Sequence, residues 1–124
     1  MPAYNTADFD PPAPVALVSF VNPDTGQQRD NVPMLLDTGA DASVVPHVVF
    51  QALSTTERTT AYEVEYLEGQ TATLYSTRLQ MKWRGNNFTG DFLVARTSHG
   101  VIGRNILNHL RLVLDGPTLQ WEVP

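Results

Sequence analysis

Residues 35–41 read LLDTGAD, so two apolar residues run into an acid, a small hydroxyl residue and a glycine. The run Pro33–Leu36 is short, apolar and bounded by polar residues, which predicts a buried strand. Asp37 then leaves this strand and enters a turn, where Gly39 permits backbone angles that a side chain would forbid. Because a carboxylate at the end of a buried strand is costly unless it is hydrogen-bonded or shares a proton, Asp37 is the first candidate for chemistry.

The size and composition of the chain limit the kind of protein that Asp37 belongs to. The 124 residues favour one domain with a modest core. The 8 basic and 13 acidic residues give a formal net charge of −5, which argues against nucleic-acid binding because that needs a basic face. The chain has no cysteine, which excludes a disulfide framework, a thiolate nucleophile and a cysteine-based zinc site.

The histidines and the apolar runs give further expectations. His47, His99 and His109 are scattered without a standard metal-ligand spacing, so we expect no metal and no other cofactor. No apolar run approaches the length of a membrane span, and the proline-rich residues 1–14 do not resemble a signal peptide. We therefore expect a soluble, cytoplasmic protein with no nucleic-acid or membrane partner.

The loop at Asp37 resembles that of a known family. Leu35–Asp41 is similar to the active-site loop of the retropepsins, the dimeric aspartic proteases of retroviruses, which have relatives in retroelements, bacteria and eukaryotes. A second segment, Val101–Leu107 (VIGRNIL), is similar to the apolar-apolar-glycine segment and helix that close the retropepsin domain. The two segments lie in the family's order, about 60 residues apart, and the resemblance covers roughly residues 15–114.

The resemblance implies an all-β fold, namely the closed barrel of an acid-protease half-domain with one short C-terminal helix and a flap hairpin. Residues 15–124 are expected to form this single domain, with an extra C-terminal hairpin at residues 111–123. The proline-rich residues 1–14 are expected to form an extended N-terminal arm. This arm could be a disordered tail, could pack on a partner subunit or could be removed by self-cleavage.

The segment 62–75 is the candidate for the flap. Aromatic or apolar residues alternate with acidic ones over residues 62–66, and Glu68-Gly69 follows at the place where a hairpin would turn. An ordinary solvent-edged hairpin would show the same pattern. The position in the chain favours the hairpin that, in the retropepsins, folds over bound substrate.

A single aspartate is not sufficient for protease chemistry of this kind. Without a metal or a covalent intermediate, peptide hydrolysis needs a base that activates water and an acid that protonates the carbonyl oxygen. Two carboxylates that share one proton supply both functions. The chain offers one suitable strand-terminal aspartate, because the second Asp-Thr-Gly, Asp24–Gly26, follows Asn-Pro and is typical of a turn. We therefore expect a homodimer whose two-fold axis passes between the two copies of Asp37.

The residues that follow the catalytic aspartate have separate expected roles. The resemblance implies that the hydroxyl of Thr38 bonds to the partner's backbone. Gly39 lets the backbone pass close to the substrate, and Ala40 places a methyl group where a hydroxyl would donate to the carboxylate. Asp41 and Arg104 are the expected ion pair that ties the loop to the helix, although two unrelated surface charges would give the same sequence.

An apolar cleft beside the scissile bond is also expected, and it predicts a preference for large apolar side chains in a peptide or protein substrate. The strand residues could equally be plain core. The expected lining residues are Leu35, Val44, Val101 and Ile102 from the strands, and Tyr66, Leu67 and Gly69 from the flap.

Three functional hypotheses follow from these residues. The leading one is an aspartic endopeptidase that acts as a homodimer. The second is a retropepsin-like dimer with a weak or silent catalytic pair, retained as a binding or scaffold module. The third, phosphoryl transfer on Asp37, needs an α/β sheet with further metal-binding acids, whereas this sequence is nearly all β.

Overall fold

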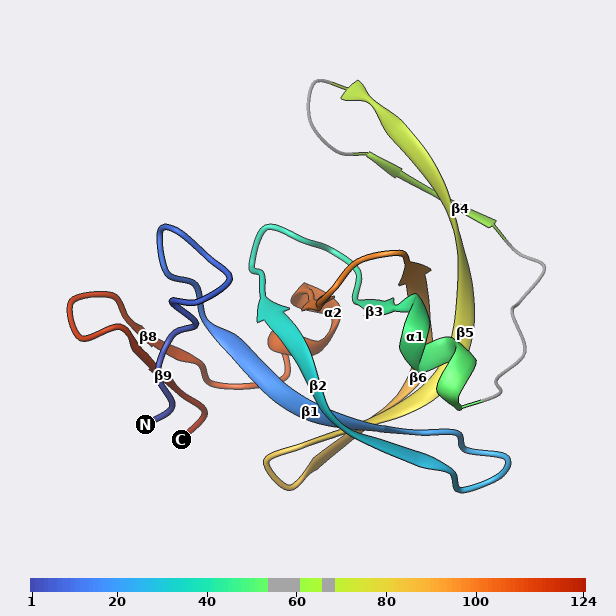
Figure 1. Cartoon of the computed structure of the whole chain (residues 1–124), viewed down its shortest axis with the longest axis horizontal. Helices are drawn as coiled ribbons and strands as arrows, with labels where there is room; N and C mark the ends of the chain where they lie inside the picture. Colours follow the sequence, from blue (N-terminus) through green and yellow to red (C-terminus); the bar gives the residue numbers. More distant parts are fainter. Residues whose placement is uncertain (54–60, 66–68) are drawn as a thin grey trace.

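The computed structural model describes residues 1–53, 61–65 and 69–124 (Figure 1). The strands in these residues are β1 (Val15–Val21), β2 (Gln28–Leu36), β3 (Val44–Pro46), β4 (Ala61–Glu65), β5 (Thr71–Trp83), β6 (Asn86–Ala95), β7 (Gly100–Ile102), β8 (Val113–Asp115) and β9 (Gln120–Glu122). The helices are α1 (His47–Ala52) and α2 (Arg104–Leu107).

Six of the strands close into a barrel. They are hydrogen-bonded in the order β1-β2-β7-β3-β6-β5, and the pairing of β5 with β1 completes the ring. The neighbours are antiparallel except for β2 with β7 and β3 with β6, which are parallel. The fold is therefore the all-β closed barrel that the sequence predicts.

The interior of the barrel is filled by alternate residues of its strands. In β1, Ala16, Val18 and Phe20 are buried and Leu17 between them is exposed, as expected for a strand with one face on the core. Phe20 packs edge-on against Phe92 of β6, with ring centroids 5.2 Å apart. Apolar burial of this kind is the main force that holds the barrel closed.

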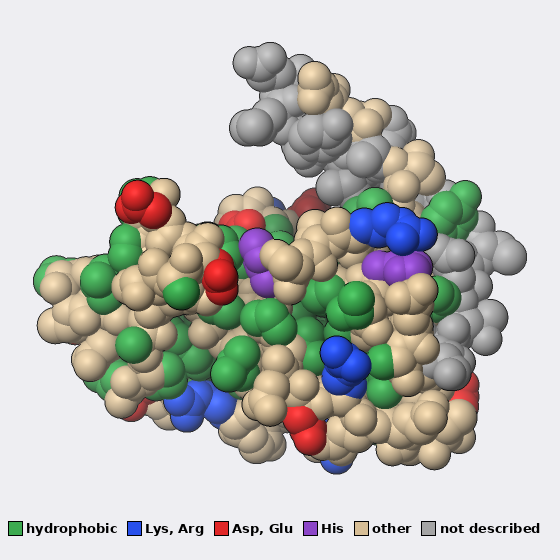
Figure 2. Space-filling view, in the orientation of Figure 1, with side chains coloured by type: hydrophobic (Ala, Val, Ile, Leu, Met, Phe, Trp, Pro, Cys, Tyr) green, Lys and Arg blue, Asp and Glu red, His purple; other side chains and the backbone are tan. Residues whose placement is uncertain are grey.

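The predicted hairpin at residues 62–75 is confirmed. β4 pairs with the first part of β5, from Ala61 opposite Tyr75 to Glu65 opposite Thr71. The outer part of β5 stands clear of the barrel, with a hollow beneath it (Figure 2). Gly69 has a φ of +73°, the left-handed conformation that glycine adopts readily in turns.

The N-terminal segment folds back on its own chain. Ala3 forms a β-bridge with Gln120 of β9, and a second bridge joins Asn5 to Ala13. The side-chain oxygen of Asn5 accepts hydrogen bonds from the backbone N–H groups of Ala7 and Asp8, at 3.0 and 2.9 Å, which turns the chain. The segment that was predicted to be an extended arm is therefore a loop that packs against the C-terminal hairpin.

The described residues contain two short helices. α2 ends at Leu107, because the N–H groups of His109 and Leu110 donate to carbonyl oxygens only three residues back, at 3.0 Å each, which is a tighter turn than that of an α-helix. A second short helix, α1, begins directly after Pro46. Within the described residues, no helix is long and apolar enough to cross a membrane.

Gly100 lies where three strands meet, since β7 is flanked by β2 and β3. A Cβ atom at this position would collide with the carbonyl oxygen of Val44 on β3 and with the side chain of Met34 on β2. The absence of a side chain therefore allows β7 to fit between its neighbours.

We predict that Gly100→Ala lowers the free energy of unfolding by about 1–3 kcal/mol, because backbone and core have to move to accept the methyl group. Urea denaturation followed by circular dichroism measures this change. Gly90→Ala is the matched control, because Gly90 is also a strand glycine and nothing lies within 4 Å of its added Cβ. Equal losses of stability in the two variants would show that the crowding at β7 is unimportant.

Candidate active site

Asp37 directly follows the last residue of β2. Its backbone N–H donates to the carbonyl oxygen of Ile102 at 3.0 Å, which extends the pairing of β2 with β7 by one residue. Its carboxylate accepts the N–H of Gly39 at 2.9 Å, and its carbonyl oxygen accepts the N–H of Ala40 at 3.2 Å. A half-buried carboxylate is thus held at the end of a core strand by the backbone of its own turn.

Gly39 is needed for space rather than for unusual backbone angles. Its φ lies outside the left-handed region, so the prediction that its backbone angles require glycine is wrong. A Cβ atom at this position would lie 3.1 Å from the carboxylate oxygen Oδ1 of Asp37, which is closer than most Cβ contacts. Glycine therefore lets the N–H group approach the carboxylate without crowding it.

α2 is attached to the Asp37 loop by two hydrogen bonds from Arg104. The backbone N–H of Arg104 donates to the carbonyl oxygen of Ala40 at 2.8 Å, and the guanidinium Nη1 donates to the carbonyl oxygen of Thr38 at 2.8 Å. Thr38 and Asp41 are both exposed. The ion pair between Asp41 and Arg104 and the contact of the Thr38 hydroxyl with a partner's backbone stay predictions.

A buried serine connects the end of the same loop to the start of α2. Ser43 is only 1% exposed; its Oγ accepts the N–H of Gly103 at 3.0 Å and donates to Oδ1 of Asn105 at 2.8 Å. Sequence reasoning missed this role of Ser43 and Asn105, because the two residues are 62 positions apart. The available signal was a polar residue inside the otherwise apolar run Ala42–Val45.

Three half-buried apolar residues lie in a row beside the loop. Leu35 of β2 pairs with Val101 of β7, and Val101 also pairs with Val44 of β3. Because paired residues of neighbouring strands point to the same face of a sheet, these three side chains form one apolar strip. The fourth strand residue of the predicted cleft, Ile102, is completely buried and belongs to the core.

The structure describes only part of the predicted flap contribution to the cleft. Gly69 is exposed at the end of the β4–β5 hairpin. Tyr66 and Leu67 lie outside the described residues. Their predicted contacts with substrate stay predictions.

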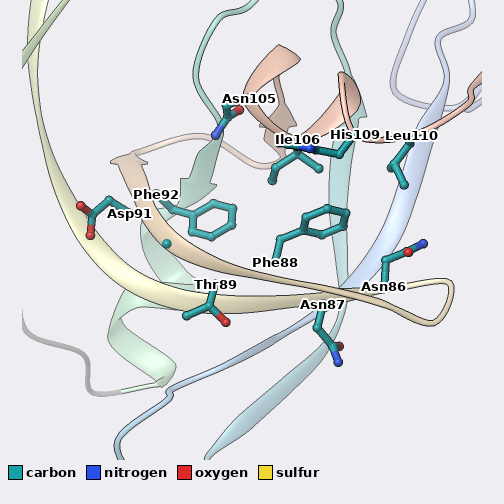
Figure 3. Close-up of a pocket in the computed structure, with 11 residues that line it drawn as sticks. Asn86, Asn87, Phe88, Thr89, Asp91, Phe92, Asn105, Ile106, His109 and Leu110 are labelled. Atoms are coloured by element: carbon teal, nitrogen blue, oxygen red, sulfur yellow. The ribbon is translucent and has the colours of Figure 1, made fainter.

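A cavity of about 530 Å³ lies elsewhere, between β6 and α2 (Figure 3). The rings of Phe88 and Phe92 point toward the side of the cavity that Ile106 and Leu110 form, and none of residues 35–41 lines it. In the described part of the chain, no group of three or more His, Asp or Glu side chains is placed to hold a metal ion.

A closed barrel of this topology, with one Asp-Thr-Gly loop at the end of a core strand, defines the half-domain of an aspartic protease. The family model described as "Retroviral aspartyl protease" matches residues 21–115, which is most of the chain. This chain therefore belongs to the retroviral aspartyl protease family.

A comparison with solved structures supports the same fold. The chain is similar to EIAV protease complexed with the inhibitor HBY-793, with a TM-score of 0.58 and 23% sequence identity over 85% of this chain and 91% of that chain. A search of curated proteins found no match.

We predict that Ser43→Ala lowers the free energy of unfolding by about 1–3 kcal/mol, because the buried N–H of Gly103 loses its acceptor. Chemical denaturation of the purified variant measures the loss. Ser98→Ala is the control, since Ser98 is an exposed loop residue, and we expect a change within about 0.5 kcal/mol. If both variants unfold like the parent chain, the bond from Ser43 to the start of α2 does not stabilise the loop.

Proposed function

We propose that this chain is an aspartic endopeptidase that hydrolyses peptide bonds as a homodimer, with one Asp37 from each copy at the two-fold axis. The observation that carries the proposal is the turn at Asp37, which presents a single carboxylate at the end of a core strand in a member of an aspartyl protease family. The carboxylate is supported from β7 and, through the loop, from α2.

The need for a second copy follows from the proton transfers. The ionised carboxylate takes a proton from water while the water oxygen bonds to the carbonyl carbon, and the protonated carboxylate gives its proton to the carbonyl oxygen. When the resulting diol collapses, the C–N bond breaks and the amine nitrogen receives a proton from the pair. The hydrogen bond described for the Asp37 carboxylate is with its own turn, and the proposal takes the second carboxylate from another copy of the chain.

The apolar strip of Leu35, Val44 and Val101 supports a proposal about which peptide substrates this reaction would favour. The strip lies on the strands that flank the Asp37 loop, so a peptide bound at the loop would contact it. We propose that large apolar side chains next to the scissile bond are preferred, because each such side chain would gain about 1.5–3 kcal/mol on full burial.

The proposal predicts that Asp37→Asn reduces hydrolysis of a peptide library by at least about 10²-fold, because the amide can act neither as base nor as acid. Cleavage is measured by mass spectrometry of the library products. Asp24→Asn is the matched control, because it alters the second Asp-Thr-Gly, which forms the turn between β1 and β2. An active Asp37→Asn variant, or a parent chain that cleaves nothing while dimeric, would exclude the protease and favour a binding module.

We also predict that activity is greatest at mildly acidic pH, and that Ala40→Ser moves the acid limb of the pH profile of kcat/KM to lower pH. A hydroxyl that donates to a carboxylate stabilises its charged form, so the base of the pair would stay ionised in stronger acid. Ala52→Ser, at the exposed end of α1, is the control and should leave the profile unchanged. A maximum near pH 2 for the parent chain, or an acid limb that Ala40→Ser leaves in place, would contradict this role of residue 40.

A further inference from the structure

A further cavity lies on the outer face of the barrel, and its volume of about 410 Å³ is within the range of small-molecule sites, about 300–1,000 Å³. None of residues 35–41 lines it, and most of its lining residues lie outside residues 21–115, which match the family model. We propose that this cavity binds a small carboxylate with an aromatic body, and that Arg84 pairs with the carboxylate. The proposal is independent of the proposed function, because it uses no residue of the Asp37 loop.

The floor of the cavity is an apolar patch of β1. Val15 and Leu17 point outward, because they alternate with the buried residues Ala16 and Val18. Residues 2 and 3 of the N-terminal segment add to this apolar lining. Leu17 is 63% exposed, so an apolar group that enters the cavity would remove apolar surface from water.

Two tryptophans supply the aromatic part of the lining. Trp83 at the end of β5 and Trp121 of β9 pack with ring centroids 5.8 Å apart, and both line the cavity. An aromatic ligand could pack against these rings in the same way. The indole N–H of Trp121 is buried and has no hydrogen-bond partner among the described residues. A carboxylate oxygen is an acceptor of the kind that this donor lacks.

Arg84 places a positive charge beside the tryptophans. Its guanidinium carbon lies 5.2 Å from the centre of the Trp121 ring, which is a cation–π contact. Within the described residues, no carboxylate forms an ion pair with this guanidinium. Its N–H groups are therefore available to pair with a carboxylate, whose two oxygens match the planar fork of an arginine.

The backbone at Arg84 points to the same role. Arg84 and Gly85 form the two-residue turn between β5 and β6, with φ values of +50° and +78°. A turn of this kind favours Asn, Asp or Gly at its first position, and a long side chain rarely adopts a positive φ. Strained residues of this sort gather at binding sites. An arginine is thus held in an uncommon conformation at the place where it covers the indole ring.

The charges around the cavity favour a ligand with one negative charge. The second cation of the lining, Lys82, pairs with Ser19 of β1, and Oγ of Ser19 donates to Oδ1 of Asp30 at 2.6 Å. Hydrogen bonds from Ser19 and Gln28, and to a smaller extent the charge of Lys82, lower the pKa of Asp30. Because the charges of Lys82 and Asp30 offset each other, the charge of Arg84 remains. A carboxylate matches this single charge better than a doubly charged phosphate.

Binding of hydrocinnamate, a phenyl ring joined to a carboxylate by a short chain, tests the proposal. We expect the full chain to bind it with a dissociation constant of about 1 mM or lower, measured by calorimetry. The fluorescence of tryptophan should change in parallel, because the only two tryptophans of the chain line the cavity. Hydrocinnamamide, which has the same body without the charge, should bind at least about 10-fold more weakly.

Two variants assign the binding to this cavity. Arg84→Asn removes the cation and places a favoured residue in the turn, so the variant should fold and bind hydrocinnamate at least about 10-fold more weakly. Leu17→Glu adds a negative charge at an exposed position and should weaken binding to a similar extent. Arg96→Gln is the matched control, because Arg96 is exposed and does not line the cavity. Circular dichroism confirms that each variant is folded.

The outcomes that contradict the proposal are distinct from those that contradict the protease. Equal affinity for the acid and its amide, or equal affinity of the parent chain and folded Arg84→Asn, would overturn it. So would an absence of binding up to about 10 mM hydrocinnamate. Tighter binding of phenyl phosphate would overturn the choice of a carboxylate. Asp37→Asn should bind hydrocinnamate like the parent chain, and a loss of binding in that variant would place the ligand at the Asp37 loop instead.

Discussion

The parallel pairing of β2 with β7 is the interaction on which the rest of this structure depends. It sets Leu35 beside Val101 and Leu36 beside Ile102, and the N–H of Asp37 continues it to the carbonyl oxygen of Ile102. This pairing places β2 and β7, which are far apart in the sequence, side by side. Because a parallel pair cannot be joined by a short turn, a long connection has to link β2 to β7, and here that connection forms β3, β4, β5 and β6 of the sheet.

The tight fit around β7 explains why glycine and serine occupy particular places near the loop. A side chain at Gly103 would collide with the carbonyl oxygens of Ala40 and Ala42, so the start of α2 can press directly on the loop. Ser43 then supplies the acceptor that the N–H of Gly103 needs at a buried position. The Asp37 turn is therefore fixed mainly by close backbone contacts, to which the Asp37 carboxylate adds the hydrogen bond that it accepts from the N–H of Gly39.

The sequence predicts local features of this molecule well and long-range contacts poorly. The strand that ends at Leu36, the hairpin at residues 62–75 and the turn at Asp37 follow from apolar patterning and turn chemistry, which act between near neighbours. The contact of Ser43 with Asn105 and the folding of residues 1–14 onto β9 depend on chain segments that meet only in the complete barrel. The residue pattern within one segment does not indicate which distant segment it contacts.

Under the proposed function each chain carries one of the two catalytic carboxylates, so activity depends on the association of two chains. The Asp37 turn is complete within one chain, so a second copy would supply the missing carboxylate without rebuilding the loop. The fraction of active sites would then follow the dimer fraction by mass action, and dilution would silence the enzyme.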